Sequence, residues 1–134
     1  MFDQTHTSLA EKTMDLLTEI LRWRTGIEAA LDYAEGSHTF DDVVRKILTN
    51  EVHFFAYPDC FLIMQVVLYP QYKNYHCFLA GGNQTALDRA RDDMIANARA
   101  LNCRHMSISG RHGWVRRLAS RNWKHVFSTM YLEL

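Results

Sequence analysis

The first fifty residues place apolar and polar side chains at the period of an α-helix. The apolar side of the first segment carries Leu9, Leu16, Ile20 and Trp23. This spacing predicts an amphipathic helix that ends near Gly26, followed by a second short helical piece over 27–34. Thr39 begins a clearer pattern, because its hydroxyl can cap a helix whose first turn carries Asp41 and Asp42. We therefore expect residues 1–51 to be helical.

After this helical part the apolar pattern takes the period of β-strands. VHFFAY at 52–57 and CFLIMQVVLY at 60–69 are separated by Pro-Asp, which predicts two strands joined by a tight turn. YHCFLA at 75–80 predicts a third strand that runs into two glycines. The short connections favour an antiparallel meander. Residues 60–69 are apolar on both faces, as expected of a strand covered by helices on both sides.

Residues 85–101 have the strongest helical pattern in the chain, with an alanine-rich apolar side. Thr85 and Asp88 resemble a capping box at its start. CRHMSIS at 103–109 predicts the next strand, so strand, helix and strand would form a βαβ crossover with one parallel pairing.

Two more elements are predicted after the crossover: a short helix over 114–120 and a closing strand over 124–134. The whole order predicts a single α+β domain over residues 1–134. Its three layers would contain a mixed, mostly antiparallel sheet, with residues 1–51 helical and residues 52–134 forming the sheet and its crossover helices.

Charge is distributed unevenly along a chain whose total is zero. Residues 1–51 carry ten acidic and five basic side chains, whereas residues 94–134 carry one acidic and seven basic ones. Such asymmetry indicates either an acidic partner or a fold in which the basic end lies near the acidic helices. The zero total favours the second interpretation, because long-range attraction of a partner needs an unbalanced field.

Cysteine content and hydropathy exclude several classes of protein. The three cysteines lack CxxC spacing, which argues against a disulfide framework or a zinc knuckle and favours buried thiols. No apolar run is long enough to span a bilayer, and the first residues lack the features of a secretory signal. We expect a soluble chain that is not secreted.

The stretch GRHGWVRRLASRNW at 110–123 combines glycines, tryptophans and arginines. We expect its glycines to permit a tight turn from strand to helix, with Trp114 packed beneath it. The basic residues in and just after the stretch would form a rim that contacts a partner: Arg111, Arg116, Arg117, Arg121 and Lys124. Aromatic side chains among basic residues are also typical of a nucleic-acid-binding surface, but the neutral net charge of the chain disfavours this role.

The histidines offer one candidate general base and no metal site. His76 lies in the third predicted strand, where an imidazole can act as a base or make a single structural hydrogen bond. His105 and His112 flank a turn without a third ligand at useful spacing, so we expect no metal there.

Four segments of the chain resemble the GNAT family of N-acetyltransferases, and more narrowly the small GNAT-like proteins that tailed bacteriophages encode among head and internal-virion genes. They are FLAGG at 78–82, ALNC at 100–103, SGRHGW at 109–114 and YLEL at 131–134. With the order of elements, the resemblance covers most of the chain. It implies a GNAT-like fold that is trimmed at both ends.

The resemblance also implies a site for acetyl-CoA where the third strand meets the long helix. In the family, backbone amides at this place hold the pyrophosphate, as helix starts commonly do for anions. The corresponding residues here are Gly81, Gly82, Asn83, Gln84 and Thr85. We expect Gly82 to adopt a positive φ or to permit the close approach of another segment.

The chain differs from the family pattern at this site. Two adjacent glycines replace spaced ones, and the helix that often supplies a tyrosine acid contains none between 114 and 123. We therefore expect a non-catalytic virion or assembly protein without a cofactor. It would act as an interaction module in the virion or the host cytoplasm, binding other phage structural proteins, or itself through sheet edges.

Two alternatives remain open. One is an acetyl-CoA-dependent N-acetyltransferase of unknown substrate, with His76 as base. The other is a protein that binds nucleic acid or acidic proteins through its basic C-terminal third.

Overall fold

Helices come first in the fold and the sheet follows. A computed structural model describes residues 9–34, 36–109, 117–119, 121–126 and 129–134, with the backbone alone for 9–12. The helices are α1 (Leu9–Arg22), α2 (Arg24–Leu31), α3 (Phe40–Leu48) and α4 (Gln84–Ala100). The strands are β1 (His53–Ala56), β2 (Cys60–Leu68), β3 (Lys73–Gly82) and β4 (His105–Ile108). Residues 117–119 are also helical.

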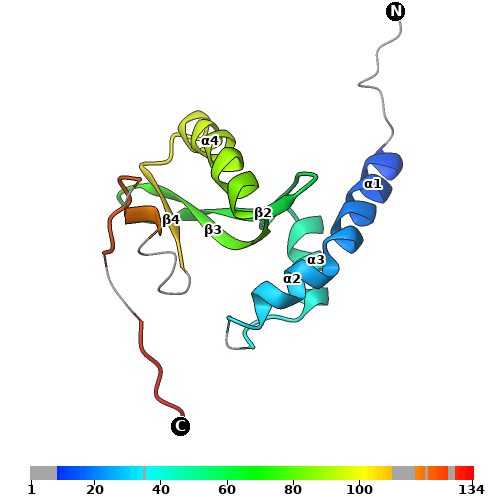
Figure 1. Cartoon of the computed structure of the whole chain (residues 1–134), viewed down its shortest axis with the longest axis horizontal. Helices are drawn as coiled ribbons and strands as arrows, with labels where there is room; N and C mark the ends of the chain where they lie inside the picture. Colours follow the sequence, from blue (N-terminus) through cyan, green and yellow to red (C-terminus); the bar gives the residue numbers. More distant parts are fainter. Residues whose placement is uncertain (1–8, 35, 110–116, 120, 127–128) are drawn as a thin grey trace, which may run out of the picture.

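The four strands form one sheet in the order β1-β2-β3-β4 (Figure 1). β1, β2 and β3 pair antiparallel, whereas β3 and β4 pair in parallel across the α4 crossover. The expected α+β class and its mixed, mostly antiparallel sheet are therefore confirmed for the described residues.

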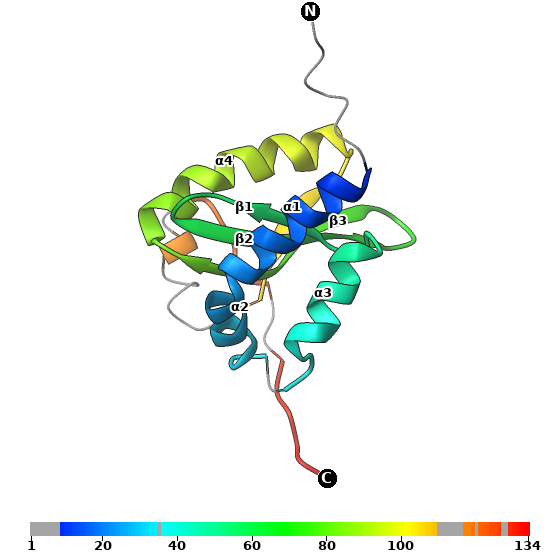
Figure 2. The ribbon, with the colours of Figure 1, turned by 90° about the vertical axis from the view of Figure 1, so that its right-hand side faces the viewer.

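Helices cover both faces of the sheet (Figure 2). On one face, α1, α2 and α3 pack on a core of large side chains that includes Ile20, Phe61 and Ile63. On the other face, α4 packs through Ala90 and Met94 on a second core of smaller side chains. β2 contributes to both cores, as its two apolar faces predicted.

A bulge in β3 changes which side chains face α4. Ile63 pairs with Leu79 and the next residue, Met64, pairs with Cys77, so Phe78 is an extra residue in β3. Before the bulge, Cys77 belongs to the α4 core, whereas Phe78 and Leu79 both pack on the opposite face. Ala80 then returns to the α4 side.

Two predicted helix boundaries were wrong. α1 ends at Arg22, and Gly26 lies inside α2 rather than at a helix end. A side chain at Gly26 would meet the ring of Phe61 at 3.0 Å, so packing explains this glycine. α4 begins one residue earlier than expected, with Asn83 in place of Thr85 as its cap.

The predicted closing strand is not formed in the described residues of 124–134, which have no regular structure. The apolar residues of this segment are exposed, so they gain no stabilisation from the core of their own chain. The predicted packing of Trp114 lies outside the described residues. No helix within the described ranges has the length and apolar character needed to cross a bilayer.

Candidate functional site

The start of α4 is closed by bonds from its own chain. The Asn83 side chain caps the helix by accepting a hydrogen bond from the Ala86 amide at 3.0 Å. The Asn83 amide in turn donates to the Asp59 carbonyl at 2.8 Å. One backbone amide of the predicted phosphate-binding segment is therefore already engaged, as is the amide of Ala86 just beyond it.

Gly82 fixes the path of the chain into this cap. Its φ is +111°, which disfavours any residue with a side chain. A Cβ at this position would lie 2.5 Å from the Asp59 carbonyl oxygen and 2.6 Å from the Cys60 Cα. Both expectations for Gly82, a positive φ and a close approach, are confirmed.

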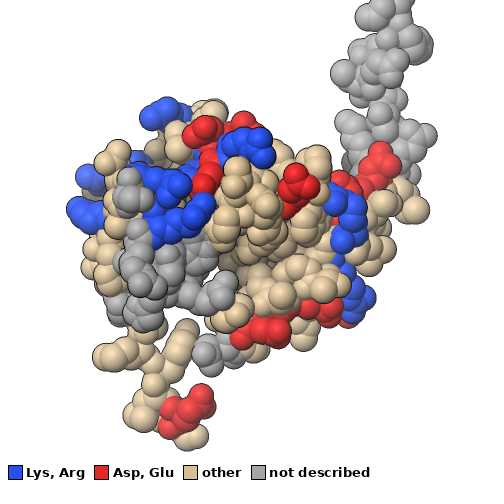
Figure 3. All heavy atoms as spheres, viewed as in Figure 1, with Lys and Arg blue, Asp and Glu red and all other residues tan. Residues whose placement is uncertain are grey.

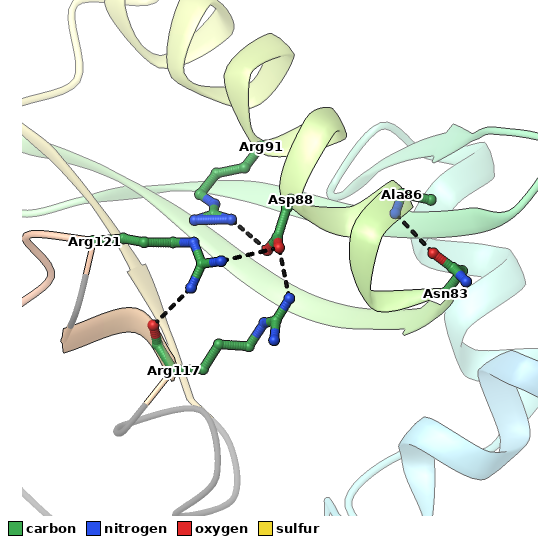
Figure 4. A network of polar contacts seen from close by, with 6 residues as sticks. All are labelled: Asn83, Ala86, Asp88, Arg91, Arg117 and Arg121. Atoms are coloured by element: carbon green, nitrogen blue, oxygen red, sulfur yellow. Dashed lines mark hydrogen bonds and ion pairs between the residues drawn. The ribbon is translucent and has the colours of Figure 1, made fainter.

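Asp88 lies one turn further along α4 and binds three arginines (Figure 4). Arg91 contacts one carboxylate oxygen, while Arg117 and Arg121 contact the other. Arg121 also donates to the Arg117 carbonyl at 3.0 Å, which stabilises the turn of helix at 117–119. Asp88 therefore holds the segment after β4 against α4, instead of completing the capping box that we predicted.

The charges of this group do not cancel, since three guanidinium groups surround one carboxylate. Partial burial favours the neutral acid, but hydrogen bonds from Arg91 and Arg117 outweigh it and hold the pKa of Asp88 below its usual value. Asp88 is thus ionised at neutral pH. The group keeps a net positive charge on the molecular face where basic side chains gather (Figure 3).

Beside Asp88 lies a mostly apolar hollow between α4, β3, β4 and the segment after β4. Its cavity volume is about 50 Å³, and its mouth is open to solvent. Its floor comes from Cys77, Ala80, Met106 and Ile108 on the sheet, and Trp123 and Leu118 form part of its wall. Burial raises the pKa of the Cys77 thiol to about 12, so this thiol is protonated and unreactive at neutral pH.

The hollow lies where β3 extends beyond its parallel partner. β4 pairs with β3 only from Asn74 to Cys77, so residues 79–82 of β3 pair with β2 but with no residue of β4. The small side chain of Ala80 leaves space there that a larger residue would fill.

His76 belongs to a different place, on the opposite face of the sheet. It lies between Tyr75 and Cys77, which both face α4, so its side chain points away from the hollow. Its Nδ1 lies 2.8 Å from the Ser107 hydroxyl oxygen, and that oxygen accepts a hydrogen bond from Asn74 at 2.7 Å. The hydroxyl can therefore donate to an unprotonated His76 Nδ1.

Burial lowers the pKa of His76, which favours this neutral form of the ring. A second histidine joins the same network from β4, because His105 Nδ1 lies 2.8 Å from the Asn74 side-chain oxygen. His76 thus has a complete structural role between β3 and β4. The structure does not bring it together with Gly81–Thr85.

Of the predicted basic rim, Arg117 and Arg121 share an acidic partner on α4, where we had expected partners on the N-terminal helices. Lys124 is exposed, and Arg111 and Arg116 lie outside the described residues. Arg91, Ser107 and Asn74 were not predicted as functional residues. A basic residue three positions after an acidic one on a predicted helix is a signal for Arg91. The other two residues need the strand register.

Comparison with known proteins shows the fold alone. The chain is similar to the crystal structure of a tetramutant of the BH1408 protein from Bacillus halodurans, with a TM-score of 0.63 and 15% identity. The match covers 91% of this chain and 96% of the other. A scan against protein-family models and a search of curated proteins give no match.

Proposed function

We propose that this chain is a GNAT-like virion or assembly protein of a tailed bacteriophage, acting as an interaction module rather than as a catalyst. The observation that carries the proposal is the exposure of its last apolar residues. Met130, Tyr131 and Leu132 are each exposed by more than three quarters. A run of large exposed side chains at one place is typical of a surface that a partner covers.

The closed start of α4 supports the same proposal. An acetyl-CoA pyrophosphate would need free amides there, but the Asn83 side chain and the Asp59 carbonyl already occupy two donors. Around the hollow, Cys77 stays protonated and Asp88 stays ionised, so neither suits proton transfer near neutral pH.

The proposal is tested by asking whether the chain enters phage particles through its apolar end. We expect the parent chain in purified particles or assembly intermediates, and a variant with Met130→Ser and Leu132→Ser at much lower occupancy. Leu68→Ser, which removes an exposed leucine at the end of β2, is the matched control and should enter normally. Absence of the parent chain from both kinds of particle would overturn the proposal.

A second candidate function is acetyl-CoA-dependent N-acetyl transfer, favoured by one observation. The apolar hollow runs beside the stretch of β3 that pairs with β2 alone and has the positive Asp88 group at its side, so it could admit part of an extended ligand with an anionic end. His76 lies on the other face and would not serve as base for a ligand there. Calorimetric titration with acetyl-CoA separates the two candidates: saturable heat, weakened by Ala80→Leu in the hollow, favours transfer.

A further inference from the structure

Thr129–Leu134 has the alternating pattern of a strand and pairs with no other described residue of its own chain. Met130, Leu132 and Leu134 are apolar, whereas Thr129, Tyr131 and Glu133 between them carry polar groups. Met130 is exposed by 92% and Leu132 by 83%. Figure 1 shows this segment leading away from the sheet. An alternating segment of this kind is suited to one side of a sheet edge.

The sheet offers an edge with a matching pattern. β4 pairs with β3 on one side only, so in the described part of the chain its other side presents unpaired backbone groups. Met106 and Ile108 face the hollow, while His105 and Ser107 face the polar network on the opposite side. A strand added here would place apolar side chains beside Met106 and polar ones beside Ser107.

Charge favours one direction for the added strand. In an antiparallel arrangement the later residues of the added strand lie beside the beginning of β4. Glu133 then comes near Arg104 and His105, whose side chains are exposed. A parallel arrangement places Glu133 beyond Ile108, far from these basic groups. The antiparallel direction therefore combines both patterns, apolar beside apolar and acidic beside basic.

We infer that Thr129–Leu134 of one copy adds as an antiparallel strand to the free edge of β4 in a second copy. Among the described residues of one chain, both the segment and the edge are unpaired, which is why we assign the partner to another copy. A reciprocal exchange satisfies both edges at once and closes a two-fold dimer. The inference rests on the proposed interaction function and names the first partner that this surface takes.

Light scattering coupled to size exclusion tests the inference on the full chain. We expect twice the mass of one chain, falling to one chain on dilution. Tyr131→Pro combined with Leu132→Pro should give one chain at every concentration, because neighbouring amides of a strand point to opposite sides, so one of the two prolines removes a donor to β4. Leu68→Ser, the control, should stay dimeric. The helical signal in circular dichroism should be unchanged, since residues 131 and 132 lie outside the folded core.

Hydrogen exchange distinguishes a second copy from folding back within one chain. We expect the amides of β4 and of Thr129–Leu134 to be protected at high concentration and to lose this protection together on dilution. Protection that is independent of dilution would mean that the strand pairs with its own β4, and would overturn the inference. A parent chain that is monomeric at all concentrations would also overturn it.

Failure of this inference is separable from failure of the proposed function. A monomeric chain that enters particles through Met130 and Leu132 leaves the interaction function standing and removes only the second copy as partner. A dimer that is absent from particles and assembly intermediates leaves the second copy standing as partner and removes the proposed function.

Discussion

The two faces of the sheet are packed in different ways. The face under α1, α2 and α3 is filled by large aliphatic and aromatic side chains, and Phe61 and Ile63 at its centre are completely buried. The face under α4 combines Tyr75 and leucines with alanine, cysteine and methionine and leaves the hollow beside Asp88. The first face is therefore filled, whereas the second has room for a ligand or for movement.

The largest expected effect comes from removing the centre of the filled face. Phe61 packs against Trp23 and Phe54 at ring distances of 5.4 and 6.4 Å. We expect Phe61→Ala to lower the free energy of unfolding by about 3–5 kcal/mol, as for other buried aromatic residues. Met94→Ala on the α4 face should cost less, about 2–3 kcal/mol, because the neighbouring hollow lets the site relax. Urea unfolding measures both, and equal losses would contradict the comparison.

Adding side-chain volume should also destabilise the filled face more than the face that contains the hollow. A Cβ at Gly81 would lie 2.7 Å from the Phe61 ring, so Gly81→Ala should cost about 1–3 kcal/mol by overpacking. Ala80 lines the hollow, and Ala80→Val should change stability by only about 0.5 kcal/mol. Thermal melts of the two neighbouring variants provide the measurement. A large loss for Ala80→Val would show that the hollow is already filled.

The elements that could be predicted from the sequence are those with strong local patterns. The continuous apolar run of residues 60–69 and the helical stripe of α4 are strong local signals, and both elements were predicted. The bulge at Phe78 was not predicted, because it depends on pairing between β2 and β3 rather than on a local pattern. The closing strand was predicted from alternation alone, and alternation does not say with which strand a segment pairs.

The site was predicted only in part, for the same reason. Gly82 was identified because the need for a positive φ is a local property of the chain. The Asp88 group joins α4 to residues that are 29 and 33 positions away, and no spacing rule relates them. His76 was a reasonable candidate by residue type. Its place depends on which face of β3 it occupies, and that requires the fold.

The last expected effect is electrostatic and concerns the ionised Asp88, which binds Arg117 and Arg121 from α4. The folded state lowers the pKa of Asp88 below 3.8, so its stabilising contribution is complete above that value and is lost as the pH falls through the folded pKa. Asp88→Asn removes the charge at every pH and should lower the free energy of unfolding by about 1 kcal/mol at neutral pH, because the arginines are partly exposed.

Urea unfolding of parent and variant between neutral and strongly acidic pH measures the difference. Asp92→Asn on an exposed position of the same helix is the matched control and should follow the parent throughout. We expect the gap between Asp88→Asn and the parent to close only in strong acid. A gap of the same size at every pH would mean that the shape of the aspartate, rather than its charge, holds the segment in place.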